Sequence, residues 1–452
     1  MTSHHPLSPG GQSAQSSRPV AELDSPQSIA AEVSAQLETF LAEKAAQFEA
    51  ISPDAAAIGE SLTAFTRGGK RIRPVLLWWG FQLAGGRVSG SADRSANPAN
   101  PVNPANPANP VNPANPANPA TTAAGLAQAA GSLELLHAAA LIHDDVIDHS
   151  DTRRGQPSLH RQFESRHGRQ GLRGDAESFG VSASIVIGDI CLALSEELFE
   201  RAQETLGGNT RARELRGTVR RDVMVGQYLD VLAEVIALDD DRIGERAWEV
   251  LSFKSAKYSV EQPLLLGAAL AGADDDLLDE ISDFGLPLGQ AFQLRDDVLG
   301  IAGDPQATGK PAGDDIREGK RTVLIAETVA RISPAQFDVL ASRLGDPDLT
   351  DAEVAECVEM ITSSGGLAAV EAFIEDKHAR AQNLVDTWAA AGTEATRPGT
   401  AGSGWATETS MSEPTTASAA DSDPTASARV RIGAPAQERL KEFATALSYR
   451  AS

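Results

Sequence analysis

Most of this chain consists of segments whose apolar residues recur at i, i+3, i+4 and i+7, the spacing that places them on one side of an α-helix. Five such segments cover residues 28–51, 73–85, 131–148, 182–206 and 214–236. They are rich in Ala, Leu, Glu, Arg and Gln, and they seldom show the alternation of apolar and polar residues that indicates a strand. Aromatic residues make up 5% of the chain, which is low for a β-sandwich. The pattern predicts an all-α fold.

Three segments of biased composition interrupt the helical pattern. Residues 1–25 are rich in Ser, Pro and Gly, and we expect a disordered tail there. Residues 96–120 repeat Asn-Pro-Ala or Asn-Pro-Val, and proline at every third position prevents helix propagation and favours an extended linker. Residues 393–428 are rich in Ser, Thr and Pro. We therefore expect one helical domain over residues 26–392 that contains the Asn-Pro-Ala insert, a second insert, and a C-terminal helix over residues 429–452.

The charge balance narrows the possible partners. The 452 residues include 39 Lys and Arg against 63 Asp and Glu, a formal net charge of -24, which repels nucleic acids. Two cysteines, Cys191 and Cys357, are too few for a disulfide framework and lack the spacing of a zinc site. We see no apolar leader and no apolar run long enough to cross a membrane. We predict a soluble, cytoplasmic protein with no transmembrane segment and no nucleic-acid partner.

An apolar, Ala-rich segment ends in the motif DDxxD, formed by Asp144, Asp145 and Asp148. On a helix, residues i and i+4 lie one turn apart on one face, so Asp144 and Asp148 converge on one site. Carboxylates held in this way suit a Mg²⁺ ion that keeps several waters and shares a phosphate. The alternative is a solvated acidic end of a helix. His137 lies on the same face, where it could donate to a diphosphate or serve only in packing.

A second acidic pair, Asp296 and Asp297, follows another apolar helical segment, and Gly300 stands where a third Asp would complete DDxxD. The Gly-rich loop beyond it carries further charged residues, namely Asp304, Lys310, Asp314, Asp315, Lys320 and Arg321. Such a loop could be an ordinary solvated turn. If the two acidic helices instead face each other across a cavity, each holding Mg²⁺, they would grip a diphosphate from both sides.

Basic residues that could hold a phosphate occur in two places. The stretch RGGKRIRP places two glycines before Lys70, Arg71 and Arg73, and its proline suits the first turn of the following helix. The alternative is an ordinary basic helix terminus on the surface. Arg153 and Arg154 follow the first acidic motif, which they could also simply balance. These residues together predict a helical protein that binds a diphosphate with an apolar tail.

These motifs resemble the trans-isoprenyl diphosphate synthases, or polyprenyl synthetases, and most closely geranylgeranyl diphosphate synthases of the actinobacterial type. The motifs occur in the family's order: GGKRIRP, LHAAALIHDDVIDHSDTRRGQPSLH, the Gly188-Asp189 pair, GQYLD, FKSAKYSVEQPLLLGAALAG and FQLRDDVLGIAGDPQATGKPAGDDIREGKRT. The resemblance implies an isoprenoid synthase-type helical bundle around a central cavity. It also implies a Mg²⁺-dependent prenyltransferase in which isopentenyl diphosphate attacks an ionised allylic diphosphate (dimethylallyl, geranyl or farnesyl) head to tail, giving a trans-prenyl diphosphate.

The resemblance also implies a role for each matching position. The metal ligands would be Asp144, Asp145, Asp148 and Asp296, with Asp297 supporting them. These four acids and Lys254 would be the catalytic residues, acting with about three Mg²⁺ ions when the allylic diphosphate is bound. The positions that hold the allylic diphosphate are Arg153, Lys254, Gln293 and Lys310. The positions that bind isopentenyl diphosphate are Lys70, Arg73, His137 and Arg154. A homodimer is also implied.

Two departures from the family pattern concern the metal site. Gly300 removes a possible carboxylate, so we expect the site to depend on Asp296 and to show a weaker or altered Mg²⁺ dependence. Ser255 replaces the usual Thr after Lys254 but keeps the hydroxyl, so we expect a mild effect.

Residues before the first acidic motif set the floor of the tail pocket in this family. Here Ala139 and Ala140 are too small to stop the chain early, and Leu136 and Leu133 are the next floors. We predict a geranylgeranyl product. The alternatives are a longer polyprenyl or a farnesyl product, a class I terpene cyclase, or a non-catalytic partner subunit. The intact GGKRIRP stretch argues against a cyclase, and the retained acidic motifs argue against an idle subunit.

Overall fold

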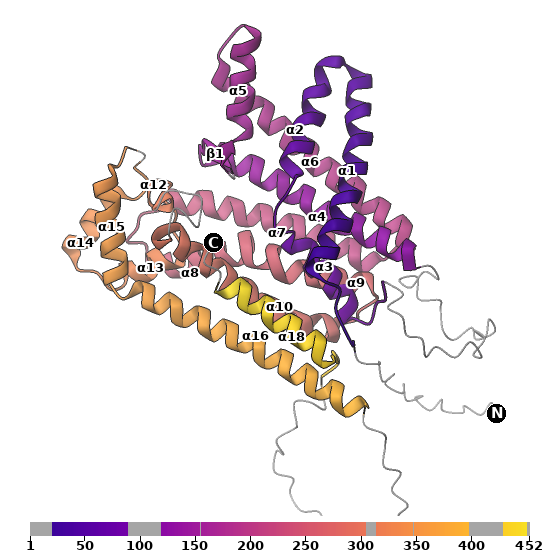
Figure 1. Ribbon diagram of the computed structural model, residues 1–452. Helices are drawn as coiled ribbons and strands as arrows, with labels where there is room; N and C mark the ends of the chain where they lie inside the picture. The colour runs from indigo at the N-terminus through magenta and orange to yellow at the C-terminus, as the bar shows by residue number, and fades with distance from the viewer. Residues whose placement is uncertain are drawn as a thin grey trace, which may run out of the picture.

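The computed structural model describes residues 20–88, 119–153, 155–303, 313–346, 348–396 and 428–449. Within these ranges the chain is helical apart from one two-stranded antiparallel pair, so the predicted all-α fold is confirmed (Figure 1). The helices of the first half are α1 (Pro26–Ile51), η1 (Pro53–Ala55), α2 (Ala56–Thr66), α3 (Ile72–Leu83), α4 (Pro119–Ile147), α5 (Leu159–Gln170), α6 (Ala176–Leu206) and α7 (Thr210–Val235). Those of the second half are α8 (Ile243–Val250), η2 (Leu251–Glu261), α9 (Gln262–Leu270), α10 (Asp275–Ala302), α12 (Asp314–Arg317), α13 (Val323–Val329), α14 (Pro334–Arg343), α15 (Asp351–Ser363), α16 (Gly366–Thr396) and α18 (Ala434–Ser448). The strands are β1 (Thr152–Arg153) and β2 (Gln156–Pro157).

Local sequence explains where several of these helices begin. Ser25 caps α1 by accepting a hydrogen bond from the backbone of Ser28, and a proline occupies the first turn. Asp175 caps α6 in the same way, while Thr350 and Glu353 form a capping box at α15. These side chains satisfy backbone N–H groups that have no partner within the helix.

Helix α4 is the central element of the first half. It packs against α6, α1 and α3, and most of its side chains are buried on every side. The main hydrophobic core surrounds it and includes Trp79 and Trp388. A second core lies among α10, α13, α15 and α16. Because α4 is buried all round, its acidic C-terminal end emerges inside the molecule rather than at the surface.

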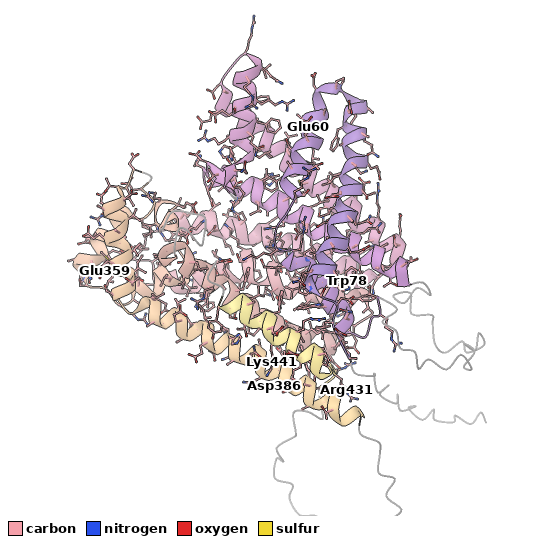
Figure 2. All side chains as sticks on the ribbon, in the orientation of Figure 1. Glu60, Trp78, Glu359, Asp386, Arg431 and Lys441 are labelled. Atoms are coloured by element: carbon pink, nitrogen blue, oxygen red, sulfur yellow. The ribbon has the colours of Figure 1, made fainter. Side chains whose placement is uncertain are left out.

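The C-terminal helix closes the second half of the bundle. Helix α18 lies along α16 and α10 (Figure 1), and the ion pair between Lys441 and Asp386, at 2.5 Å, joins α18 to α16 (Figure 2). The backbone of Val20 donates to the carbonyl of Arg431 at 2.7 Å, so the start of the described chain is fastened beside α18.

The predicted domain boundaries fall largely outside the described residues. Helix α1 begins one residue after the predicted tail, and α16 continues four residues into the predicted second insert. Residues 1–19, most of 96–120 and residues 397–427 lie outside the described part of the chain. The division into tail, domain and inserts stays a prediction.

Two helices within the described ranges are long and apolar enough to cross a membrane by length and composition alone. They are residues Ala120–Ile147 and Ala176–Leu206, and the most apolar window of each is 78% and 39% buried inside the protein. The first owes its apolar character to its central place in the core. The expected absence of a transmembrane segment therefore stays a prediction, because composition alone does not support it.

Candidate active site

A cavity of about 550 Å³ opens where α4, α7, η2 and α10 meet, with the loop before α3 and the segment around α12 at its edges. Nine residues predicted to bind a substrate, a metal or the product tail line it, namely Lys70, Arg73, His137, Ala140, Asp144, Arg153, Lys254, Gln293 and Asp296. Residues far apart in the sequence, such as Lys70 and Asp296, therefore meet in one cavity. Its walls carry both signs of charge.

Each acid of the first motif already has a cationic partner. Asp144 accepts from Lys254 Nζ and from Gln227 Nε2, each at 3.0 Å. Asp145 is fully buried and accepts from Arg153 Nε at 2.7 Å. Asp148 lies 3.6 Å from Lys320 Nζ. The acidic end of α4 is therefore neutralised from within the site, and the interpretation as a solvated helix end does not hold.

Lys254 reaches Asp144 because of the unusual helix that carries it. Residues Leu251–Glu261 form a π-helix, a rare and wider helix that frequently occurs at functional sites. Helix α7 approaches it closely at Gly226, where a Cβ atom would lie 2.7 Å from the Cα of Lys254. This approach pairs Lys254 with the buried Asp230 of α7 as well as with Asp144. Lys254 thus links α4, α7 and η2.

The second acidic wall of the cavity, formed by Asp296 and Asp297, lies on α10. Asp296 and Asp297 both line the cavity, and Asp297 is largely buried and accepts from Gln293 Nε2 at 2.8 Å. Gly300 follows one turn later and lies against the carboxylate of Asp315 in α12. Lys320 stands between the two walls, 3.6 Å from Asp148 and 3.7 Å from Asp315, and it also pairs with Glu318. The two acidic helices therefore share one cavity, as predicted.

Burial and the neighbouring charges shift the pKa values of these carboxyl groups in different directions. Burial raises the pKa of Asp148 to about 6, and the nearby charge of Asp144 adds to this effect. Burial also acts to raise the pKa of Asp144, but Lys254 and Lys320 outweigh it and hold that pKa below its ordinary value. Burial raises the pKa of Asp297 to about 8. The first wall thus keeps one firmly charged carboxylate and one that titrates near neutrality.

Three of the predicted isopentenyl diphosphate residues, Lys70, Arg73 and His137, also line the cavity. Arg71 adopts a left-handed conformation with φ of 50°, which is costly for a residue other than glycine. Its buried guanidinium pairs with Glu134 of α4 and donates to the carbonyl of Thr66 at 2.6 Å. These bonds fix the turn that presents the exposed Lys70.

Arg73, one turn further on, is held by η2. It donates to Ser259 Oγ at 2.7 Å, and its guanidinium carbon lies 4.3 Å from the ring centre of Tyr258. The ring of His137 lies 6.2 Å from the same tyrosine. Arg73, His137 and Tyr258 thus lie together in the cavity.

The other predicted residues are placed differently. Arg154 and Lys310 lie outside the described residues. Ala140 lines the cavity, while three other residues proposed for the pocket floor are buried in the core and do not line it: Ala139, Leu136 and Leu133. Ser255 lines the cavity beside Lys254.

Sequence reasoning quoted four further residues of the site within its motifs but assigned none of them a role, namely Gln227, Asp230, Tyr258 and Lys320. Gln227 and Asp230 belong to the GQYLD motif and lie three positions apart, so their shared helix face was visible in the sequence. Tyr258 lies four positions after Lys254. Lys320 had no periodic pattern to mark it, because it lies in a loop whose path only the fold defines.

The donor chemistry of the site fits Mg²⁺ held together with a diphosphate. Within the described residues, no three carboxylate, histidine or cysteine side chains lie close enough to hold a metal ion by themselves. The acids are instead paired with lysine and arginine. A Mg²⁺ ion that arrives with a diphosphate would supply charge of both signs, so the acids could turn to the metal and the cations to the phosphates. Asp144, Asp148 and Asp296 would then hold the metal.

The fold is a helical bundle, and its cavity contains carboxylates that are paired with lysines and arginines. This combination is typical of a class of enzyme that acts on diphosphates. The family model for polyprenyl synthetases matches residues 56–361, and the chain belongs to that family. It is a prenyltransferase that makes trans-prenyl diphosphates. The resemblance drawn from the motifs is confirmed.

Similar proteins share most of the chain. A geranylgeranyl diphosphate synthase of Saccharolobus solfataricus is 28% identical over 305 residues, which cover 67% of this chain and 75% of the relative. A geranylfarnesyl diphosphate synthase of Aeropyrum pernix is 26% identical over 349 residues, or 75% and 89% of the two chains. The solved geranylgeranyl pyrophosphate synthase of Corynebacterium glutamicum, complexed with isoprenyl diphosphate and magnesium, is 31% identical with a TM-score of 0.70, covering 94% and 98%.

Proposed function

We propose that this enzyme is a Mg²⁺-dependent geranylgeranyl diphosphate synthase that condenses isopentenyl diphosphate with dimethylallyl, geranyl or farnesyl diphosphate. The observation that carries the proposal is that one cavity contains both acidic motifs, through Asp144 and Asp296. The same cavity is lined by the cations Arg153, Lys254 and Lys320 and by a second basic group, Lys70 and Arg73. Similar proteins that support this product include a geranylgeranyl diphosphate synthase among the relatives and another among the solved structures. Mg²⁺, about three ions with the allylic substrate, would neutralise the diphosphate as it leaves.

The allylic diphosphate binds between the acidic walls. Metal ligation falls to Asp144, Asp148 and Asp296. Asp145, which the resemblance also named as a ligand, is fully buried and supports the site by holding Arg153. The phosphate oxygens fall to Arg153, Lys254, Gln293 and Lys310. We add Lys320 to this group, because its ammonium already lies between Asp148 and Asp315. Cations placed where negative charge develops stabilise the transition state more than the bound substrate.

Isopentenyl diphosphate binds in the same cavity, on Lys70, Arg73, His137 and Arg154. Arg73 is held by Ser259 and by the face of Tyr258, so its orientation is set before the substrate arrives. The two substrates then lie in one cavity with the apolar carbons between them. This second diphosphate site disfavours a terpene cyclase, which needs only one diphosphate.

The product tail extends past Ala140 toward Ala139, Leu136 and Leu133. Ala140 faces the cavity, whereas the other three lie behind it in the core. Small residues at the first two positions leave room for a geranylgeranyl chain. A longer polyprenyl product is the second candidate, since a relative makes geranylfarnesyl diphosphate.

The enzyme works as a cytoplasmic homodimer. Its two cysteines are both free and buried, as suits a reducing compartment. Exposed apolar side chains gather on α6 and α7, among them Val186, Val225 and Tyr228, which are 54%, 48% and 65% exposed. Ion pairs from Arg216 and Arg220 to Glu196 hold these two helices together. A second copy of the chain would cover this surface.

The direct test is to incubate the purified protein with Mg²⁺, labelled isopentenyl diphosphate and each short allylic diphosphate, and to size the products. We expect a geranylgeranyl product. A longer product would overturn the chain-length assignment alone. Turnover of an allylic diphosphate to a hydrocarbon without isopentenyl diphosphate would indicate a cyclase, and no product from any substrate would indicate a non-catalytic subunit.

A further inference from the structure

Gly300 occupies the position at which the second acidic motif would have its third carboxylate, and the carboxylate of Asp315 lies where a side chain at that position would begin. A Cβ atom built on Gly300 would lie 2.7 Å from Cγ of Asp315 and closer still to its Oδ2. Real Cβ atoms do not approach other heavy atoms so closely. The carboxylate of Asp315 thus fills the space that a side chain at position 300 would need.

Backbone bonds hold Asp315 at this place. The N–H of Gly313 donates to the carbonyl of Gly300 at 3.1 Å, which docks the start of α12 on α10. The N–H of Lys320 donates to the carbonyl of Asp315 at 3.0 Å, which closes the turn behind it. These bonds place the main chain of Asp315 beside α10, and its carboxylate lies over Gly300.

Asp315 also faces the site. It lines the same cavity as Asp296 and Lys320, and its carboxylate lies 3.7 Å from Lys320 Nζ. The same lysine contacts Asp148 of the first acidic motif at 3.6 Å. Lys320 therefore contacts one carboxylate from each acidic wall, namely Asp148 beyond the end of α4 and Asp315 in α12.

We propose that Asp315 supplies the third carboxylate of the second acidic wall in place of the side chain that Gly300 lacks. The inference rests on the proposed function, because it concerns the Mg²⁺ and diphosphate of that site. Since no three acids of the described chain are close enough to hold a bare ion, Asp315 acts on the waters that Mg²⁺ retains in proteins. One metal is then held jointly by α10 and α12.

The test compares three variants in their binding of Mg²⁺ with inorganic diphosphate, measured by isothermal titration calorimetry rather than by turnover. We expect Asp315→Asn to raise the half-saturating Mg²⁺ concentration about tenfold or more, as for other groups that hold a metal's waters. Gly300→Asp should also weaken Mg²⁺ binding, because the new side chain collides with Asp315. The double variant Gly300→Asp/Asp315→Ala should bind Mg²⁺ more tightly than either single variant.

Two comparisons separate this role from simpler ones. Asp351→Asn removes an exposed carboxylate that pairs with Arg317, and it should leave Mg²⁺ binding unchanged. Binding of diphosphate in EDTA reports the effect of Asp315 on Lys320 without metal. If Asp315→Asn weakens diphosphate binding equally with and without Mg²⁺, or if the double variant is no better than the single ones, Asp315 only orients Lys320 and the proposal is overturned.

The same titration distinguishes this inference from the proposed function. Asp296→Asn should abolish most Mg²⁺-dependent binding if the site is assigned correctly. A wild-type protein that shows no Mg²⁺-dependent binding of diphosphate would overturn both proposals. A normal wild type and a defective Asp296→Asn variant, together with an unaffected Asp315→Asn variant, would overturn the role of Asp315 alone.

Discussion

At the residue scale, the burial of acidic side chains is the feature of the site that costs the folded state most. Asp145, Asp230 and Asp297 are all nearly inaccessible to solvent, and the cost of burying a charge is met differently for each. Asp145 pairs with Arg153, and Asp230 pairs with Lys254. Asp297 accepts a hydrogen bond from the neutral Gln293 amide, and burial raises its pKa to about 8. This residue should therefore contribute to the pH dependence of the metal-free protein.

We expect Asp297→Asn to stabilise the metal-free protein at alkaline pH. Burial raises the pKa of Asp297 from 3.8 to about 8, so between these values the folded state holds a proton that the unfolded state has lost. Stability then falls as pH rises, by up to about 1.4 kcal/mol per pH unit for this group. Urea unfolding in EDTA at pH 5 and pH 8 measures the effect. The stability of wild type and variant should converge below about pH 4, and an equal pH slope in both would contradict the assignment.

Product length should respond to Ala140 more directly than to its neighbour. Ala140 lines the cavity, so we expect Ala140→Phe to shorten the product with little loss of stability. Ala139 is fully buried, so Ala139→Phe should instead overpack the core and cost about 1–3 kcal/mol. Product chromatography and thermal unfolding of both variants test this division. Normal product length in Ala140→Phe would show that the tail runs along another wall.

At the scale of elements, the site is built from helix ends and irregular turns. The acids of the first wall lie at the C-terminal end of α4, Lys254 lies on the π-helix η2, and Lys70 lies in the turn before α3. Regular helices alone could not bring these groups together. The π-helix and the left-handed Arg71 both depend on contacts with other helices, through Gly226 and Glu134 respectively.

We expect Glu134→Gln to loosen the turn that carries Lys70. The variant keeps the shape of the side chain but removes the charge that holds Arg71 in its left-handed conformation. Breaking a buried ion pair typically costs about 3–5 kcal/mol, and the amide should reduce that loss because it can still accept a hydrogen bond. Steady-state kinetics should show a larger rise in KM for isopentenyl diphosphate than for the allylic substrate. Equal changes in the two KM values would mean that Glu134 serves stability alone.

At the scale of the whole molecule, the bundle leaves an apolar surface uncovered on α6 and α7. Ile185, Val186, Met224, Val225 and Tyr228 are all more than a third exposed. Their helices are linked by ion pairs, so the surface is a fixed feature of the fold. The low burial of α6, 39% over its most apolar window, belongs to the same surface.

If this surface forms the proposed dimer, we expect Tyr228→Asp, or Val186→Asp, to give a monomer, because a charge would be buried at the contact between copies. Size-exclusion chromatography with light scattering measures the mass. Ile51→Asp is the matched control, since Ile51 is 82% exposed at the end of α1, away from α6 and α7. A wild-type mass in both interface variants would place the dimer contact elsewhere.

Several features of this protein followed from the sequence alone. Helical periodicity gave the fold class, because it depends only on which residues share a helix face. The spacing of Asp144 and Asp148 predicted one metal-binding face for the same reason. The basic stretch before α3 and the acids of α10 were recognisable by their local composition. Each of these inferences uses neighbours within a few positions of one another.

Only the tertiary structure decided which distant groups meet. The pairing of Lys254 with Asp144 and Asp230, the place of Lys320 between the acidic walls, and the carboxylate of Asp315 over Gly300 join residues from separate elements. It also separated Ala140, which faces the cavity, from Ala139, which packs in the core. The physical reason is that helix packing, rather than sequence spacing, sets the distance between groups on different helices.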